Sequence, residues 1–262
     1  MRPPNLIICG AQKSGTTALK QILQECGVHF PPPDPTRSID LKFFSDEREY
    51  ARGLPWYLKQ FELAHADELI GEKSVSYMDY PEIVPERIYS HLRNVKLIFI
   101  LRNPVDRAFS HYQYSCFHGF EQMKFSEALV MEKYRASLSN PVARIAKPWA
   151  YTERGMYASQ IEPFDRLFPG SQLHYMFSED LAQNPEPTIS RLMVFLGIEG
   201  PAPVINAEVH SAVERLRGHY TRQPSKKMQP WEKMFLLEKF AEPNRRLQNL
   251  IGRIPHSWSQ MP

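Results

Sequence analysis

The apolar residues of this chain fall into short continuous runs that alternate with segments of helical spacing. Leu6 to Cys9 form one such run, and from Thr16 to Glu25 the apolar residues recur every three or four positions. A continuous apolar run predicts a strand buried on both faces, and helical spacing predicts an amphipathic helix. The chain therefore opens with a predicted strand, loop and helix.

This order returns twice further along the chain. Residues 95–101 predict a second strand, and helical spacing resumes at 105–114 after Pro104, a residue favoured in the first turn of a helix. Residues 172–177 predict a third strand, followed by a helix that ends near Gly197. Strands that alternate with helices predict an α/β fold, with a central, mainly parallel sheet between two layers of helices.

Two other segments complete the expected organisation. Residues 117–150 carry polar and aromatic residues with weak helical signals at 126–137, and we expect them to form an insertion that covers the substrate. Residues 231–258 have the apolar spacing of a terminal helix, which we expect to pack on the sheet. A chain of 262 residues with 42% hydrophobic residues can bury a large core, so we expect one domain over residues 1–262.

Charge and cysteine content limit the partners and the compartment. With 32 basic and 29 acidic residues the net charge is only +3, which argues against nucleic acid as a partner, so any anion is bound locally. No segment approaches the roughly 18 apolar residues of a membrane span, and the glycine-rich loop at Gly10 follows Met1 too soon for a signal peptide. Cys9, Cys26 and Cys116 fit neither a disulfide framework nor a zinc site. We expect a cytoplasmic protein without a metal or a membrane partner; the sequence leaves its oligomeric state open.

The loop after the first predicted strand has the composition of a phosphate-binding site. Gly10 and Gly15 have the spacing of P-loop glycines, but Lys13 lies before the second glycine instead of after it. A loop between a strand and a helix directs consecutive backbone N–H groups, and the positive end of the helix dipole, at one point. The residues that we expect to bind an anion here are Gly10, Gln12, Lys13, Ser14, Gly15, Thr16, Thr17 and Ala18.

Residues 10–17, Gly-Ala-Gln-Lys-Ser-Gly-Thr-Thr, resemble a loop of sulfotransferases that use 3′-phosphoadenosine 5′-phosphosulfate (PAPS). In that family, and in particular in its heparan sulfate and carbohydrate branch, a G-x-x-K-[AS]-G-T-T-x-L pattern binds the 5′-phosphosulfate group. The resemblance implies the P-loop-like sulfotransferase fold and a PAPS cofactor that leaves as 3′-phosphoadenosine 5′-phosphate (PAP), with no metal required. It also implies a catalytic role for Lys13, which would stabilise the charge that develops on the leaving group.

The segment after the second predicted strand strengthens this resemblance. Arg102, at the strand end, and Ser110, eight residues later, match the residues that bind the 3′-phosphate in that family. A guanidinium offers a planar, permanently charged fork to phosphate oxygens, and a nearby hydroxyl completes such a pocket. The neighbouring Asp106 and Arg107 are interpreted as a charge pair on the helix surface.

Further motifs match the family in order along most of the chain. Residues 71–77 resemble its G-E-[KA]-S-P-x-Y segment, with Val75 in place of the usual proline. Residues 154–157 resemble its R-G-x-Y, which implies that Tyr157 binds the cofactor; residues 179–181 and 195–197 resemble its E-D-L and F-L-G. The basic residues 215–222 match the segment that closes over the adenosine 3′-phosphate, which implies that Arg217 and Gly218 bind there.

The acceptor has to lose a proton, so a general base is expected within hydrogen-bonding reach of it. In the carbohydrate branch a K-E-x-x-F-F segment supplies a glutamate for this role. Residues 39–44 here are Ile-Asp-Leu-Lys-Phe-Phe, so Asp40 stands at the glutamate position with a side chain one methylene shorter. Asp40 is the first candidate for the base, and Glu72 and His111 are alternatives.

These motifs predict a PAPS-dependent sulfotransferase that moves a sulfuryl group by in-line transfer to a hydroxyl of a small molecule or saccharide, in a biosynthetic pathway. A P-loop nucleotide kinase is one alternative, although its lysine has to reach the β- and γ-phosphates beside Mg²⁺, and Lys13 is displaced from that position. A non-catalytic nucleotide-binding protein on the same fold is the other, since it would keep the loop without needing Lys13 or a base.

Overall fold

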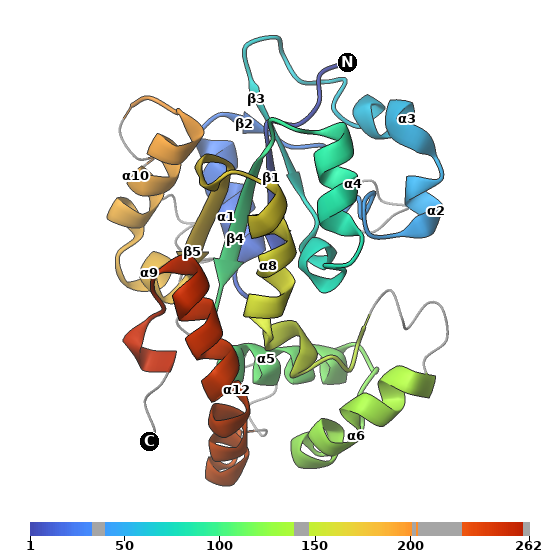
Figure 1. The fold of residues 1–262 in the computed structure, drawn as a ribbon, viewed down its shortest axis with the longest axis vertical. Coiled ribbons are helices and arrows are strands. Elements are labelled where there is room, and N and C mark those ends of the chain that lie inside the picture. Colours follow the sequence, from blue (N-terminus) through green and yellow to red (C-terminus); the bar gives the residue numbers. More distant parts are fainter. Residues whose placement is uncertain (33–39, 139–146, 201–202, 204–226, 259–262) are drawn as a thin grey trace. The chain divides into compact units, whose positions relative to one another are not determined.

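A sheet of five parallel strands, in the order β2-β3-β1-β4-β5, organises the fold (Figure 1). The computed structural model describes residues 1–32, 40–138, 147–200, 203 and 227–258. The strands are β1 (Leu6–Gly10), β2 (Val28–His29), β3 (Leu69–Lys73), β4 (Lys96–Leu101) and β5 (Leu173–Phe177). The predicted α/β fold with a parallel sheet is therefore confirmed.

Two compact units make up the chain. One consists of Met1–Leu101 with Gln160–Arg217, and the other of Arg102–Ser159 with Gly218–Pro262. The sheet belongs to the first unit. Neither unit is a continuous piece of the sequence, and the expectation of one domain over residues 1–262 stays a prediction.

Helices cover both faces of the sheet in the first unit. Ile8 of β1 and Ile98 of β4 share a core with the helices of one face, which are α1 (Thr16–Glu25), α9 (Ser178–Gln183) and α10 (Pro185–Leu196). On the opposite face Phe99 of β4 meets Phe164 of α8 (Tyr157–Leu167) edge-on, with ring centroids 5.2 Å apart. β4 is thus buried on both sides, as its continuous apolar run predicts.

The remaining elements of the first unit lie between β2 and β4 in the sequence, or just before β5. They are α2 (Glu47–Tyr50), α3 (Gly53–Lys59), the 3₁₀ helix η1 (Val75–Asp79), α4 (Val84–His91) and the 3₁₀ helix η3 (Gly170–Gln172). Phe43 stacks on Tyr57 of α3, with ring centroids 4.5 Å apart, and Phe44 packs edge-on against Tyr77 of η1. These aromatic rings fill the space beside β3.

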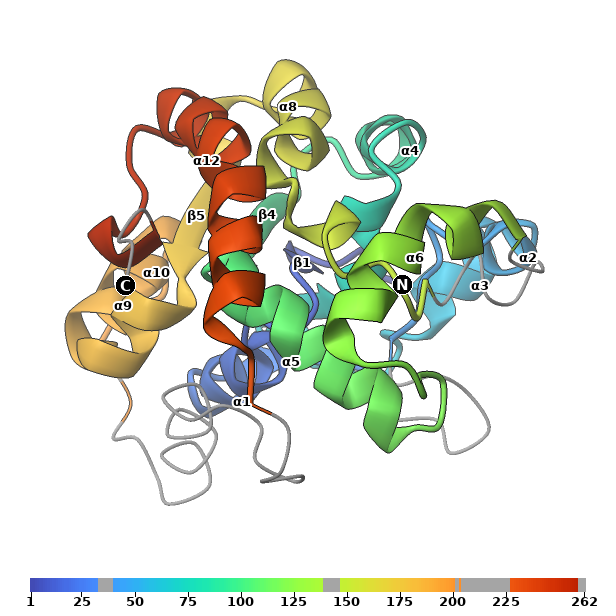
Figure 2. The same ribbon diagram turned by 90° about the horizontal axis from the view of Figure 1, so that it is seen from below.

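The second unit is helical. It contains α5 (Pro104–Phe117), α6 (Phe125–Leu138), the 3₁₀ helix η2 (Glu153–Gly155), α12 (Pro230–Ile251) and the 3₁₀ helix η4 (His256–Trp258). Figure 2 shows α6 and α12 against α5, where Phe109, Leu129 and Phe240 share one core. A terminal helix within residues 231–258 is confirmed as α12 followed by η4. Its buried Leu236 and Phe240 share a core with α5, whereas packing on the sheet was predicted.

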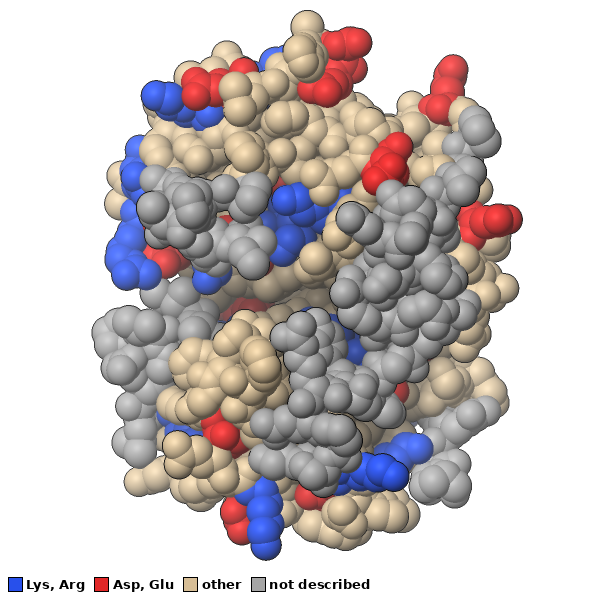
Figure 3. Space-filling model, turned by 180° about the vertical axis from the view of Figure 1, so that it is seen from behind, with Lys and Arg blue, Asp and Glu red and all other residues tan. Residues whose placement is uncertain are grey.

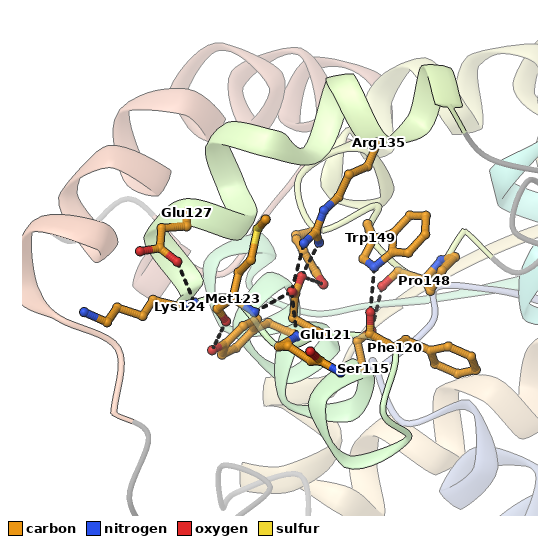
Figure 4. Close-up of polar contacts among 12 residues, drawn as sticks. Ser115, Phe120, Glu121, Met123, Lys124, Glu127, Arg135, Pro148 and Trp149 are labelled. Atoms are coloured by element: carbon orange, nitrogen blue, oxygen red, sulfur yellow. Dashed lines mark hydrogen bonds and ion pairs between the residues drawn. The ribbon is translucent and has the colours of Figure 1, made fainter.

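A buried carboxylate anchors the predicted insertion at residues 117–150 (Figure 4). Glu121 accepts hydrogen bonds from the backbone N–H groups of Gln122 and Met123, both at 2.9 Å, and from the guanidinium of Arg135 on α6. Burial alone raises the pKa of Glu121, but these donors and the hydroxyl of Tyr151 bring it below its ordinary value. The described part of the segment is thereby tied to its own unit; whether it covers a substrate stays a prediction.

The interpretation of Arg107 as a surface residue was wrong. Its side chain is fully buried, and its guanidinium donates to the carbonyl oxygen of Tyr151. The cause is that α5 contacts α12 and η2 as well as α6, so little of the helix faces solvent.

Among the described residues, no helix combines the length and the apolarity that crossing a membrane requires.

Candidate active site

The predicted phosphate loop joins β1 to α1 at the carboxyl edge of the sheet. β1 is the central strand, between β3 and β4, and Gly15 caps the start of α1 with a φ of 96°. That angle lies in the left-handed region, which glycine adopts without strain. In open parallel sheets, ligands bind outside the carboxyl ends of the strands where the strand order reverses. Residues 10–18 occupy that position in this sheet.

The donors of this loop fit an anion. The hydroxyl of Ser14 is buried, and it has no hydrogen-bond partner among the residues that the structure describes. The N-cap residue, Gly15, provides no side-chain cap, and the first N–H groups of any helix lack partners within it. Buried donors without a partner cost free energy unless a ligand satisfies them. A phosphate group at this loop would satisfy both kinds of donor.

Two contacts fix the shape of the loop. A side chain at Gly10 is impossible without rearrangement, because its Cβ would lie 2.7 Å from the sulfur of Met78 on η1. The hydroxyl of Ser178, the first residue after β5, reaches the carbonyl oxygens of Ser14 and, at 3.1 Å, of Leu101. Ser178 therefore ties the loop to the ends of β4 and β5.

Asp40 lies beside the end of β3, where two groups donate to its carboxylate. The ammonium of Lys73, the last residue of β3, forms an ion pair with Oδ1, and the side chains of Lys73 and Asp40 are only 8% and 9% exposed. The backbone N–H of Val75 donates to Oδ2 at 3.2 Å. The carboxylate is thus oriented by a different donor at each oxygen.

The segment that carries Asp40, residues 40–46, is called the Asp40 loop here and is attached to η1 by further bonds. The N–H of Lys42 donates to the hydroxyl of Ser74 at 3.0 Å, and the N–H of Phe44 donates to the hydroxyl of Tyr77 at 3.3 Å. The hydroxyls of Ser45 and Ser76 are 2.7 Å apart. These bonds hold the Asp40 loop independently of the Asp40 side chain.

Glu72 lies beneath this attachment and is fully buried. Its Oε1 accepts from the hydroxyls of Ser74 and Tyr77, at 2.8 and 2.6 Å, and its Oε2 accepts from the hydroxyl of Tyr57 at 2.5 Å. Burial raises the pKa of Glu72 to about 7, against the lowering effect of the three hydroxyls. Its burial and its three hydroxyl donors argue against Glu72 as the base that meets the acceptor.

A second lysine lies near Asp40 and Lys73. Burial lowers the pKa of Lys20, on α1, and the positive charge of Lys73 lowers it further, while the negative charge of Asp40 raises it. On the face of the molecule in Figure 3, side chains of both signs are interspersed among the described residues. Lys73 pairs with Asp40, and the charges of both residues act on Lys20.

The predicted 3′-phosphate site lies in the second unit. Arg102 directly follows the last residue of β4, and its side chain is largely buried. The hydroxyl of Ser110, two turns into α5, is buried without a partner among the described residues, as that of Ser14 is. Tyr157 is 1% exposed and donates its hydroxyl to the carbonyl oxygen of Arg102 at 2.9 Å. Tyr157 therefore holds the backbone of Arg102.

Three other predicted site residues are His111, Arg217 and Gly218. His111 is 1% exposed in the second unit, where Nδ1 lies 3.3 Å from the carbonyl oxygen of Ala150 and the ring packs edge-on against Tyr151. That burial argues against His111 as the base. Arg217 and Gly218 lie outside the described residues.

Comparison with known proteins identifies the family. Residues 3–237 match the family described as sulfotransferase domain. The chain belongs to this family. A sulfotransferase from Alicyclobacillus acidocaldarius superposes with a TM-score of 0.77 at 27% identity, covering 99% of this chain and 100% of that one. The family resemblance and the sulfotransferase fold expected from the motifs are confirmed.

Curated relatives of this sulfotransferase are longer than it is. The human bifunctional heparan sulfate N-deacetylase/N-sulfotransferase 2 is 27% identical over 97% of this chain and 30% of its own length. The mouse heparan sulfate glucosamine 3-O-sulfotransferase 3B1 is 32% identical over 75% of this chain and 46% of its own length. The chain thus spans less than half of these two relatives.

Sequence reasoning found the loop and the base candidate of this sulfotransferase but missed the residues that support them. Lys73 and Val75 belong to the segment 71–77 that resembles a family motif, but nothing in the sequence places them beside Asp40. Ser178 had one signal, its place directly after a predicted strand parallel to β4. Residues that follow parallel strands collect at one edge of the sheet.

Proposed function

We propose that this sulfotransferase transfers the sulfuryl group of PAPS to a hydroxyl of a saccharide or small molecule by in-line transfer. The observation that carries the proposal is the loop between β1 and α1 at the carboxyl end of the central strand, where the buried hydroxyl of Ser14 has no partner within the described part of the chain. When bound, PAPS supplies an activated sulfuryl group on a PAP leaving group.

The loop residues have two tasks in this proposal. Gly10, Gln12, Ser14 and the N–H groups that begin α1 hold the 5′-phosphosulfate, with Thr16 and Thr17 adding hydroxyl donors. Lys13 provides a positive charge for the phosphate oxygens, on which negative charge grows as the sulfuryl group leaves. Because these groups favour the charge of the transition state over that of the ground state, they raise the rate instead of only the affinity.

The 3′-phosphate belongs in this proposal to Arg102 and Ser110. The guanidinium of Arg102 supplies charge and paired donors. The hydroxyl of Ser110, which no described residue binds, supplies another donor. The hydroxyl of Tyr157 supports Arg102 by donating to the carbonyl oxygen of Arg102. Arg217 and Gly218 join the site on the resemblance alone.

Asp40 is the proposed general base. It takes the proton of the acceptor hydroxyl as the oxygen attacks, and Lys73 and the N–H of Val75 keep its carboxylate in one orientation. Glu72 and His111 are not proposed for this step, because they are only 0% and 1% exposed, whereas Asp40 retains an exposure of 9%.

The acceptor class follows from the relatives. Because two of them are named for heparan sulfate N- and 3-O-sulfation, glucosamine-containing saccharides are the acceptors to test first, followed by small alcohols. The proposal places the reaction in the cytoplasm, where thiols stay reduced. None of the three cysteines is part of a disulfide, which supports that compartment.

The cofactor is tested by calorimetric titration of PAP into the folded protein without added metal. We expect binding by the wild type and a loss of at least tenfold in affinity in Arg102→Ala, since hydrogen bonds to charged groups contribute about 1.5–3 kcal/mol. Ser115→Ala is the matched control on the same helix, because the Ser115 hydroxyl already donates to the carbonyl oxygen of Pro148 at 2.6 Å. If the folded wild type does not bind PAP, the proposal is contradicted. A preference for ATP with Mg²⁺ would favour the kinase alternative.

Turnover separates an enzyme from a non-catalytic nucleotide-binding protein. With sulfur-labelled PAPS and a panel of glucosamine saccharides and alcohols, we expect labelled product from the wild type. Asp40→Asn should reduce kcat by roughly 10²- to 10⁴-fold, the usual contribution of a general base, with unchanged PAP affinity. PAP binding without transfer to any acceptor would support the non-catalytic alternative.

A further inference from the structure

The carboxylate of Asp40 accepts a hydrogen bond from a backbone group of η1. The N–H of Val75, the first residue of η1, donates to Oδ2 at 3.2 Å, while Lys73 pairs with Oδ1. An ammonium on a four-carbon stem is a mobile partner, whereas a backbone N–H at the start of a helix has a fixed position. The N–H of Val75 is therefore a donor of fixed position for Oδ2.

The position of this N–H is fixed by the neighbours of Val75. Ser74 binds the N–H of Lys42, Ser76 binds Ser45, and Tyr77 binds the N–H of Phe44. The Asp40 loop is thus attached just before Val75, at Ser74, and just after it, at Ser76 and Tyr77. Because none of them involves the Asp40 side chain, the Asp40 loop would stay attached to η1 if the Val75 donor were removed.

Two departures from the family pattern meet in this one hydrogen bond. Position 75 is valine where the G-E-[KA]-S-P-x-Y pattern has proline, and proline has no N–H to donate. Position 40 is aspartate where the pattern has glutamate. The shorter carboxylate occurs together with a donor that a proline at position 75 would lack.

We propose that the N–H of Val75 is a positioning group for Asp40, and that the aspartate at position 40 depends on a residue other than proline at position 75. The contact itself is a property of the fold. Its meaning for proton removal from the acceptor rests on the proposed function.

The substitution Val75→Pro removes this donor with little else changed. Proline is favoured at the first position of a helix, where the N–H has no partner within the helix. The preceding Ser74 has φ −143° and ψ 97°, an extended conformation compatible with a following proline. Val75→Ala is the matched control, because it also removes the valine side chain but keeps the N–H.

The first experiment tests the contact between the Val75 N–H and Asp40 by hydrogen exchange, without measuring turnover. Amide-resolved hydrogen exchange at Val75 is compared between the wild type and Asp40→Ala, with the N–H groups of Lys42 and Phe44 as internal references. We expect exchange at Val75 to become at least tenfold faster in Asp40→Ala, while the two references change little. An unchanged rate at Val75 would overturn the proposal.

The second experiment is a double-mutant cycle on turnover. We expect Val75→Pro to lower kcat by about tenfold or more relative to Val75→Ala, with the KM for PAPS unchanged, because misplacing a reacting group slows the chemical step. In the Asp40→Glu background the same change should cost less than about threefold, since the longer side chain no longer depends on this donor. Equal losses of kcat in both backgrounds, or a change in KM alone, would refute the dependence of Asp40 on the N–H of Val75.

The two experiments distinguish a failure of the proposed function from a failure of the positioning role of Val75. If the wild type transfers no sulfuryl group to any acceptor, the proposed function fails, and the exchange rate of Val75 still decides whether this N–H holds Asp40. If transfer occurs and the cycle shows no coupling, the proposed function stands and the positioning role of Val75 is withdrawn.

Discussion

The ammonium of Lys73 and the carboxylate of Asp40 form an ion pair from which water is almost excluded, with 8% and 9% of the two side chains exposed. One partner ends β3 and the other lies in the Asp40 loop, 33 residues earlier in the sequence. Forming a buried pair contributes little net stability, but removing one partner leaves a charge without compensation. The pair is therefore sensitive to single substitutions.

Replacing Lys73 by methionine should destabilise the protein strongly. Lys73→Met keeps much of the side-chain volume but removes the ammonium that pairs with the buried Asp40 carboxylate, so we expect a loss of about 3 kcal/mol in the free energy of unfolding. Urea denaturation measures it. The double variant Lys73→Met/Asp40→Asn should recover part of this loss; a double variant as unstable as the sum of the two singles would show that the charges do not interact.

The unsatisfied hydroxyls of Ser14 and Ser110 predict a separation of stability from ligand binding. Ser110→Ala and Ser14→Ala should leave the melting temperature unchanged or higher, since the removed hydroxyls have no partners among the described residues. Both should weaken PAP binding, by roughly tenfold or more. Ser115→Ala should do the reverse, because its hydroxyl is bonded within the protein. A fall in melting temperature in all three with normal PAP binding would contradict this.

The pKa of Glu72 predicts how stability depends on pH. Burial raises it from 4.5 to about 7, so the folded state favours the protonated carboxyl. Between these two values the folded protein binds a proton that the unfolded chain releases, and stability is lost as the pH rises. The loss is on the order of 3 kcal/mol. Glu72→Gln, which cannot ionise, should show a flatter profile of unfolding free energy from pH 5 to pH 8.

The control for this profile is the difference between the two proteins at each pH. Burial, with the charge of Arg191, lowers the pKa of His174 to about 4, which makes stability rise between pH 4 and the ordinary value of 6.5. This opposite trend is present in both proteins and cancels in the difference. A constant difference between wild type and Glu72→Gln from pH 5 to pH 8 would disprove the raised pKa.

Gly71 should not tolerate a methyl group. A Cβ at this position in β3 would lie 2.5 Å from Cζ of Phe30, whose ring is buried against the strand. Gly71→Ala should therefore cost about 1–3 kcal/mol of stability, the usual range for overpacking. Thermal and urea unfolding measure the loss. It should shrink when Phe30→Leu makes room; an equal cost in both backgrounds would place the strain elsewhere.

The strands that the sequence predicted are those with continuous apolar runs. β1, β4 and β5 were found because both of their faces are covered, whereas β3 was not, because only Leu69 and Ile70 are apolar before Gly71 and two charged residues. β3 is a strand through its pairing with β1 and β2. Pairing between distant segments leaves no local pattern in the sequence.

The residues of the candidate site also differ in whether the sequence alone could predict them. Residues of the phosphate loop could be predicted because the chemistry of binding a phosphate dictates a contiguous set of glycines and donors. The burial of Glu72 could not, because it depends on Tyr57 and Tyr77, which reach the carboxylate from separate elements. Charged residues are usually exposed, so sequence reasoning also placed the buried Arg107 on the surface.

Met78 fills the space that a side chain on Gly10 would need, and it belongs to the same five-residue helix that holds the Asp40 loop. The helix η1 therefore supports the donor loop and the proposed base at once. A substitution that moves η1 to admit a new acceptor would also deform the phosphate loop. Changes of acceptor specificity in this lineage are thus expected to accumulate outside η1, where they can be selected without loss of the donor site.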